Sequence, residues 1–214
     1  MLYRTVTATL AALLLVGGCQ SAYYKTMEKI GYHKRDLLVG NVEDARDAQE
    51  DAKEEFTSAL EQFRSVVQFD GDELEDIYER LRRALDRSED RAQTVHKRVD
   101  KVEQVAQALF DEWETELTEY SSTELRRASE RQLDQTRARY RDLISAMHRA
   151  EGKLEPVLSP MRDHVLFLKH NLNAQAIAAI ENEVDAIELQ VNALIEDMER
   201  AIAEADKFIN AMDE

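Results

Sequence analysis

The chain has 214 residues, of which only six are glycine and two are proline, too few for a turn-rich β protein. Its 34% charged and 43% hydrophobic residues are typical of helices that each bury one narrow stripe. The formal net charge of −16 argues against nucleic acid as a partner, because phosphate binding requires clustered Lys and Arg side chains. With a single cysteine, the chain can form no intramolecular disulfide.

The N-terminal residues 1–19 have the layout of a secretory signal. Arg4 supplies a positive charge, the apolar run 6–16 follows, and two glycines separate this run from Cys19. A membrane-spanning helix needs about 20 apolar residues, so the run is too short to be one. An uncleaved membrane anchor and an N-terminal core helix are the alternatives to a cleaved signal.

The string Val16-Gly17-Gly18-Cys19 resembles a bacterial lipobox, with an aliphatic residue before small residues and a cysteine. The resemblance implies that the Cys19 thiol is diacylglycerylated, that the chain is cut before Cys19, and that the new amine is acylated. Several acyl chains anchor durably, because each buried methylene contributes about 0.8 kcal/mol. Gln20 follows the cysteine in place of Asp, and by resemblance to the sorting rule of diderm bacteria this favours the outer membrane, facing the periplasm.

We expect residues 1–18 to be the signal peptide and residues 19–40 to be a lipidated, membrane-proximal tether. Between residues 20 and 36 the chain is locally basic and rich in tyrosine. The residues concerned are Tyr23, Tyr24, Lys25, Glu28, Lys29, Tyr32, Lys34, Arg35 and Asp36. Aromatic rings and lysines beside an anchor suit the headgroup region of a bilayer. A tether that packs on the helical body is an equally good alternative.

Residues 41–214 are expected to form the helical body. Apolar residues recur there at alternating spacings of three and four, which predicts long helices with one buried face each. Four such stripes run from Val42 to Val66, from Leu74 to Trp113, from Leu133 to Leu168, and from Ile177 to Met212. The sequence therefore predicts an all-α fold: an elongated antiparallel bundle of three to four long helices with coiled-coil packing. A surplus stripe could also pair two chains into a homo-oligomer.

Two strings between the stripes predict helix starts with a capping box and a hydrophobic staple. In the string from Phe69 to Leu74, Asp70 is the expected cap. In the string from Tyr120 to Leu125, Ser121 is the expected cap, Glu124 returns the hydrogen bond, and the two terminal side chains face each other.

Pro156 and Pro160 fall within the third stripe, whose spacing continues through both. Proline removes a backbone donor and clashes with the preceding helical turn. We therefore expect a kink or a capped restart at Ser159-Pro160, without a reversal of direction. The turn into the last helix is expected at Asn171-Leu172-Asn173.

Charge is distributed unevenly along the helical body. Residues 41–76 carry thirteen acids and three bases, and residues 173–214 carry eleven acids and two bases. Residues 122–149 carry seven arginines and four acids. Pairing of this basic segment with the two acidic ones is expected to help determine which helices are neighbours.

No catalytic, metal or cofactor site is predicted. No histidine lies three or four residues from another, whereas a metal site on helices needs ligands that converge at short range. The scattered glycines exclude a P-loop and a dinucleotide fingerprint. His164 is the one histidine on a buried stripe, where a satisfied core role is expected ahead of a pH-sensitive one. The apolar string Val165-Leu166-Phe167-Leu168 is expected to be buried, with an exposed partner patch as the alternative.

Three strings resemble an uncharacterised family of bacterial lipoproteins that is defined only as a domain of unknown function. They are Tyr32–Asp36 together with Val42–Gln49, then Ala108–Glu114, then Phe167–Ala174. The resemblance covers the mature chain and implies no catalytic residues. Polar residues in these strings interrupt the stripes and are candidate partner contacts, although helix capping explains them equally well. They are His33, Lys34, Arg35 and Asp36 at one place, and Lys169, His170 and Asn171 at another.

The expected function is that of a non-enzymatic scaffold or adaptor of the cell envelope, anchored through Cys19 and binding protein partners. A regulator or chaperone-like binder of an envelope enzyme or substrate is the alternative. An enzyme with an unrecognised site is the third class.

Overall fold

The computed structural model describes residues 34–66, 74–171 and 174–213, and within these ranges it contains helices and no strand. The helices are α3 (Lys34–Ser65), α4 (Leu74–Leu117), α5 (Thr123–Glu151), α6 (Leu154–His170) and α7 (Ala174–Asp213). The predicted all-helical fold is confirmed for this part of the chain. The expected signal peptide, Cys19, His33 and the cap predicted at Asp70 lie outside the described residues.

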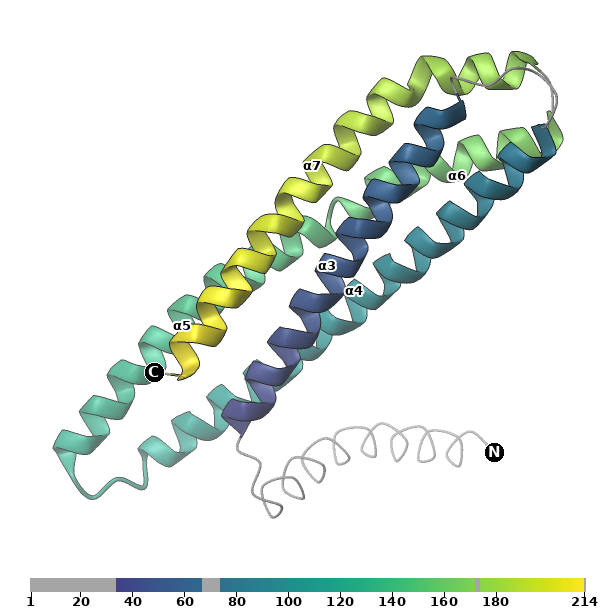
Figure 1. Cartoon of the computed structure of the whole chain (residues 1–214). Helices are drawn as coiled ribbons and strands as arrows, with labels where there is room; N and C mark the ends of the chain where they lie inside the picture. The colour runs from purple at the N-terminus through teal and green to yellow at the C-terminus, as the bar shows by residue number, and fades with distance from the viewer. Residues whose placement is uncertain (1–33, 67–73, 172–173, 214) are drawn as a thin grey trace, which may run out of the picture.

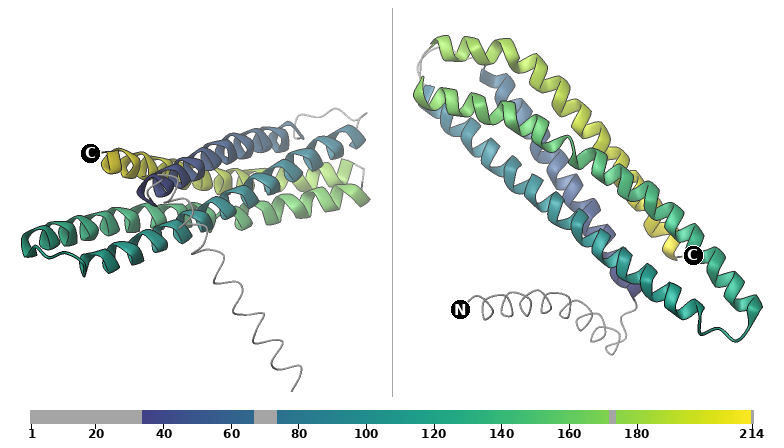
Figure 2. Two further views of the ribbon diagram at one scale, coloured as in Figure 1. Left: turned by 90° about the horizontal axis from the view of Figure 1, so that it is seen from below. Right: turned by 180° about the vertical axis from the view of Figure 1, so that it is seen from behind.

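The helices form an elongated bundle of four rods, because α6 continues α5 in the same direction along one side (Figures 1 and 2). Around the bundle the order is α3, α4, the α5–α6 rod and α7, and each rod contacts the next. Neighbouring rods are antiparallel: Arg46 of α3 meets Asp206 of α7, whereas Arg64 meets Glu188, earlier in α7. Helix α3 therefore lies diagonally opposite α5.

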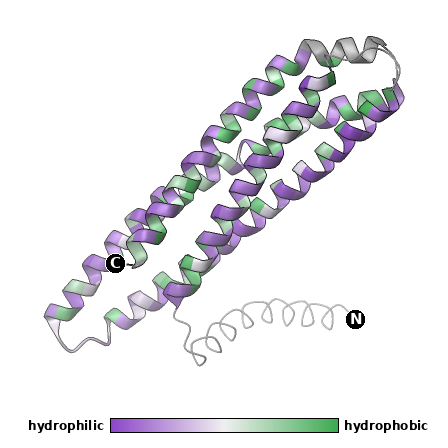
Figure 3. Cartoon of the chain, in the orientation of Figure 1, coloured by the Kyte–Doolittle hydropathy of each residue, from purple (hydrophilic) through white to green (hydrophobic). Residues whose placement is uncertain are grey.

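The core runs the length of the bundle and is made by the predicted stripes. Hydrophobic and hydrophilic residues alternate along every helix in Figure 3. The stripe from Val42 to Val66 is buried at each of its three-and-four positions, including the polar Gln49. Phe56, Phe63 and Phe208 are the largest fully buried side chains. Each such ring contributes about 1.5–3 kcal/mol of hydrophobic stabilisation.

Three arginines of α4 form ion pairs with the acidic middle part of α3. Arg87 reaches Glu55 at 2.9 Å, Arg91 reaches Asp51 at 2.8 Å, and Arg98 reaches Asp44 at 2.7 Å. The expectation that the basic segment 122–149 would pair with residues 41–76 was therefore wrong. That segment lies in α5, across the diagonal from α3, and arginines nearer in space take its place. Each exposed pair contributes little to stability, and all three agree with the antiparallel register of α3 and α4.

The third rod breaks at Gly152 and Lys153. The capped restart expected as one alternative at Ser159-Pro160 was wrong, because α6 runs unbroken from Leu154 to His170. The hydrogen bond from the Gly152 amide to the His148 carbonyl, at 2.9 Å, closes the last turn of α5. Helix α6 begins at Leu154. Pro156 explains the position, because its ring would clash with the Gly152 carbonyl in a continuous helix. Within α6 Pro156 occupies the first turn, where an amide has no helical partner, and Pro160 is accommodated inside the helix. The expected absence of a reversal is confirmed.

Helix α5 is capped one residue later than predicted. The Ser122 side chain, not that of Ser121, accepts a hydrogen bond from the Leu125 amide at 3.3 Å. This shift moves Glu124 out of the capping-box position. Tyr120 and Leu125 are 42% and 61% exposed, so the predicted staple between them was also wrong.

The bundle starts earlier in the chain than expected. Helix α3 begins at Lys34, whereas the helical pattern was expected from Asn41. Leu38 is fully buried, and Leu37 and Val39 pack against the core. Residues 34–40 therefore belong to the helical body.

Candidate functional site

The candidate contact residues lie at opposite ends of the bundle. Lys34 and Arg35 are in the first turn of α3, and Lys169 and His170 are in the last turn of α6 (Figure 1). All except Lys34 are exposed. The structure therefore contains two separate surfaces, one at each end of a stiff rod.

A groove of about 780 Å³ lies at the first of these ends, where α3 begins and α4 and α7 approach their ends. We call it the end groove. Its apolar lining consists of Val39, Leu109, Trp113 and Met212. Its polar lining consists of Lys34, Arg35, Asp36, Glu43, Glu112 and Glu116. Carboxylates outnumber basic groups in this lining, so the groove is acidic around an apolar floor.

Two of the three strings that carry the family resemblance meet at the end groove. Lys34, from the first string, lies 2.6 Å from Glu112 of the second, and its side chain is only 12% exposed. The pair therefore links the start of α3 to the end of α4. The proximity of these strings depends on the antiparallel register of α3 and α4, so the sequence alone could not reveal it.

Trp113, the only tryptophan of the chain, connects the end groove to α5. Its indole Nε1 donates a hydrogen bond to Ser129 Oγ at 2.8 Å. One side of the half-buried ring lines the groove while its nitrogen is held by the neighbouring helix. The side chain therefore has one fixed orientation at the groove.

The other end carries an exposed apolar patch, formed by Leu166 and Phe167, which are 55% and 42% exposed. We call it the α6-end patch. Their neighbours Val165 and Leu168 are buried, so the expectation of complete burial was wrong for half of this string. Lys169 and His170 follow directly, so the patch joins apolar and basic groups. Asn171 caps α6 by donating to the Phe167 carbonyl at 3.0 Å, which favours the capping explanation for this residue.

A polar cluster that sequence reasoning missed lies near the middle of the bundle. His148 of α5 contacts Glu151 at 2.8 Å and Glu103 of α4 at 3.0 Å. His96 of α4 also contacts Glu151, so one carboxylate joins two histidines from different helices. Burial disfavours the charged imidazole, but the hydrogen bonds that its ring nitrogens donate to Glu151 and Glu103 prevail and raise the pKa of His148. No spacing in the sequence could have indicated this cluster, because it spans two helices.

The break between α5 and α6 has a second polar contact on its α7 side. Lys153 Nζ lies 2.5 Å from Asp197 Oδ2 and also donates to the Ala193 carbonyl at 3.0 Å. Arg200 donates to Asp197 Oδ1 at 2.6 Å. Burial alone would raise the pKa of Asp197, but the hydrogen bonds from Lys153 and Arg200 outweigh it and lower this pKa. The break is thereby fastened to α7.

His164 lies on a buried stripe as predicted, and its side chain is 11% exposed. Its Nε2 atom is 3.5 Å from Glu183 of α7. This arrangement is that of a core-edge histidine with a partner, which agrees with the structural role.

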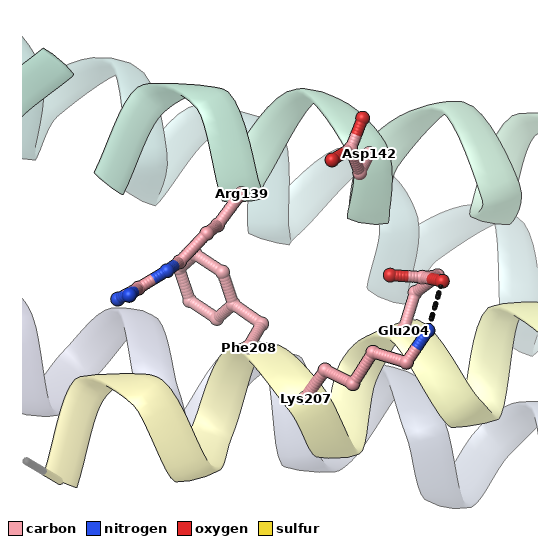
Figure 4. Close-up of a pocket in the computed structure, with 5 residues that line it drawn as sticks. All are labelled: Arg139, Asp142, Glu204, Lys207 and Phe208. Atoms are coloured by element: carbon pink, nitrogen blue, oxygen red, sulfur yellow. Dashed lines mark hydrogen bonds and ion pairs between the residues drawn. The ribbon is translucent and has the colours of Figure 1, made fainter. Parts of the chain in front are cut away.

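A smaller pocket of about 400 Å³ lies between α5 and α7 (Figure 4). Arg139, Asp142, Glu204, Lys207 and Phe208 line it. Lys207 is paired with Glu204 at 2.7 Å, and Arg139 donates to the Ala211 carbonyl at 3.4 Å. Arg139, Glu204 and Lys207 are thus engaged in contacts within α7 and between α5 and α7. They do not form a nucleophile and base pair.

In the described ranges, no group of three or more His, Cys, Asp or Glu residues has the geometry to hold a metal ion. None of the helices described is long and apolar enough to cross a bilayer.

A family model described as "Protein of unknown function (DUF2959)" matches residues 23–212. The chain belongs to this family. The match confirms the expected membership of an uncharacterised family, and the family's domain begins before α3 and extends to the end of α7. No curated protein and no solved structure matches the chain.

Proposed function

We propose that this DUF2959 protein is a non-enzymatic scaffold or adaptor of the bacterial cell envelope. In this proposal, acylated Cys19 anchors it at the outer membrane, facing the periplasm, and the helical body binds protein partners. The observation that carries the proposal is the presence of two chemically different surfaces at opposite ends of one rod. An end groove with acidic walls and a basic apolar patch suit different partners.

Two observations support the anchor: the lipobox-like string that ends at Cys19, and the place where the N-terminal segment joins the bundle. Lys34 marks the point where the N-terminal segment joins the bundle, beside the end groove. The α6-end patch is at the other end, where it would be farthest from the anchored segment. A partner bound there would be held away from the membrane by the length of the bundle.

In-cell photocrosslinking tests the scaffold. A photoreactive residue placed at Arg35 or at Phe167 should capture discrete protein partners that differ between the two positions. Placement at Leu189, which is 74% exposed on α7, is the control for random collisions. The same bands from all three positions, or none from either end, would contradict the proposal. Cys19→Ala tests the anchor separately, because it should release a folded chain from the membrane fraction.

A regulator or chaperone-like binder of an envelope enzyme or substrate is the second candidate, and the α6-end patch favours it. Exposed Leu166 and Phe167 could bind apolar segments transiently. In that case, the protein would suppress the aggregation of an unfolded client, and Phe167→Ser would abolish this effect. Crosslinks at Phe167 would then form a continuum instead of discrete bands. A reproducible turnover by the purified protein, lost on a point substitution, would instead establish an enzyme.

A further inference from the structure

The helical hairpin of α4 and α5 extends beyond the ends of the other two rods (Figure 2). Helix α3 begins at Lys34, which pairs with Glu112, yet α4 continues to Leu117 and its turn leads to Thr123. Beyond Glu112, therefore, α4 has no α3 residue opposite it. Leu117 and Trp113 pack only partly against the core there. Among the described residues nothing covers this face of α4, and the end groove opens onto it.

Residues 23–33 have the composition that this surface requires. Five of these eleven residues are apolar or aromatic: Tyr23, Tyr24, Met27, Ile30 and Tyr32. Lys25 and Lys29 against Glu28 make the segment basic at neutral pH. The groove lining has four carboxylates against two basic groups, with Val39, Leu109, Trp113 and Met212 between them. Both charge and apolar surface are therefore complementary.

The position of the segment in the chain favours the same pairing. Residue 33 is bonded directly to Lys34, which itself lines the groove, so the segment is present at a high effective concentration. The family match also begins at residue 23 and not at α3, so these residues belong to the family's domain.

We propose that residues 23–33 bind in the end groove of their own chain and cover the exposed side of Trp113. The contact combines burial of the apolar side chains on the groove floor with attraction of Lys25 and Lys29 to the acids at its rim. This inference does not depend on the lipid anchor, and a protein partner at this end of the bundle would bind the surface formed by the groove with residues 23–33 in place. Of the two expectations for the tether, the proposal corresponds to packing on the helical body.

Trp113 provides the readout, because it is the only tryptophan. In the full-length chain in non-ionic detergent, acrylamide quenching of Trp113 should be weak. Met27→Ser with Ile30→Ser should raise the quenching constant about twofold and shift emission to the red, since a half-buried indole becomes exposed to solvent. Leu189→Ser is the matched control and should leave both quantities unchanged. Far-UV circular dichroism verifies that the helices persist. Quenching that is equally strong in the parent and the double variant would overturn the proposal.

A second measurement identifies the occupant. A photoreactive residue at Ile30, in chains reconstituted with phosphatidylethanolamine and phosphatidylglycerol vesicles, should crosslink within its own chain to residues 36–43 or 109–116. Crosslinks predominantly to lipid would overturn the proposal in favour of headgroup contact. Crosslinks between two chains, detected as a dimer band, would overturn it in favour of a second copy. Repeating the experiment with Cys19→Ala tests the groove contact separately from the anchor. The intramolecular crosslink should persist even if the chain proves not to be lipidated.

Discussion

Lys153 and Asp197 join the break in the third rod to α7, with 2.5 Å between Lys153 Nζ and Asp197 Oδ2. The carboxylate is 5% exposed, whereas the lysine is 40% exposed. Lys153 also bonds the Ala193 carbonyl, one turn earlier in α7. Lys153, one of the two residues at the break, therefore also supplies the side-chain contact that joins the break to α7.

Replacing Asp197 should destabilise the bundle strongly. Asp197→Ala leaves Lys153 and Arg200 without their shared acceptor, and we expect a loss of about 2–4 kcal/mol in the free energy of unfolding. Because Lys153 is partly exposed and can be hydrated, the lower part of this range is expected. Urea denaturation provides the measurement, and Glu196→Ala, whose side chain is 69% exposed, is the control. Equal losses for the two variants would show that the contact at the break is not a stabilising one.

The same carboxylate should make stability depend on pH in the acidic range. The pKa of Asp197 is lower in the folded protein than in the unfolded chain. The contribution of Asp197 to the free energy of unfolding is therefore complete above the pKa of the unfolded chain, about 3.9. This contribution is lost as the pH falls through the lower pKa of the folded protein. The difference in unfolding free energy between the parent and Asp197→Asn should be constant from pH 7 to about pH 5 and then shrink towards pH 2. A difference that grows on acidification would contradict the assignment.

His148 should make stability depend on pH in the opposite sense. Its pKa is raised by Glu151 and Glu103, so its stabilising contribution is present below the unfolded pKa and is lost as the pH rises through the folded one. The imidazole is 45% exposed, so the contribution should stay below about 1 kcal/mol. Titration of the His148 ring by NMR tests this directly, and Glu103→Gln should lower the measured pKa. An unchanged titration in that variant would show that the contact with Glu103 does not form in solution.

Gln49 is a polar residue within the core, and its replacement should stabilise the protein. Both polar atoms of its side chain are buried without a hydrogen-bond partner in the described part of the chain. Gln49→Leu should raise the free energy of unfolding by about 1–3 kcal/mol, because the desolvated amide is removed. Gln107→Leu, on the exposed face of α4, is the matched control and should change it by less than about 0.5 kcal/mol. A loss of stability in Gln49→Leu, or the appearance of oligomers, would assign this residue to fixing helix register.

Pro156 should determine where the third rod breaks. In Pro156→Ala, the new amide can donate to the Gly152 carbonyl, and hydrogen exchange at the amides of residues 153–155 should slow about tenfold or more as the helix becomes continuous. Pro160→Ala changes a residue inside α6 and should leave exchange at Gly152 and Lys153 as it was. If exchange at the break is the same in both variants, the cause lies in Gly152 itself.

The helical stripes could be predicted because burial follows a period that is local to each helix. Leu81, Val99, Met147 and Leu194 occupy predicted stripe positions and are buried. The fine structure at the helix ends was less predictable. Ser121 and Ser122 are chemically equivalent as caps, and only the backbone conformation selects the second. The Pro156 ring prevents a helical hydrogen bond to the carbonyl four residues earlier in the chain. The break could therefore not be located from the spacing of apolar residues.

The candidate site was the least predictable feature, because it depends on where rods of unequal length end. Lys34 and Glu112 lie far apart in the sequence and meet only because α3 starts beside the last turns of α4. His96 and His148 likewise share Glu151 through the register of two antiparallel helices. Leu166 and Phe167 were misassigned because a run of four apolar residues always has one outward side on a helix.

The projecting end of the α4–α5 hairpin has a consequence for the order in which the molecule opens. From Asp111 to Gln132 no residue is fully buried, whereas the rest of both helices has core residues at nearly every turn. Little apolar surface holds this section, so its amides should exchange and its turn should be cleaved by proteases while the four-rod part stays folded. The groove beside it would then be bordered by the most easily opened section of the bundle, and whatever occupies that groove would slow its fraying.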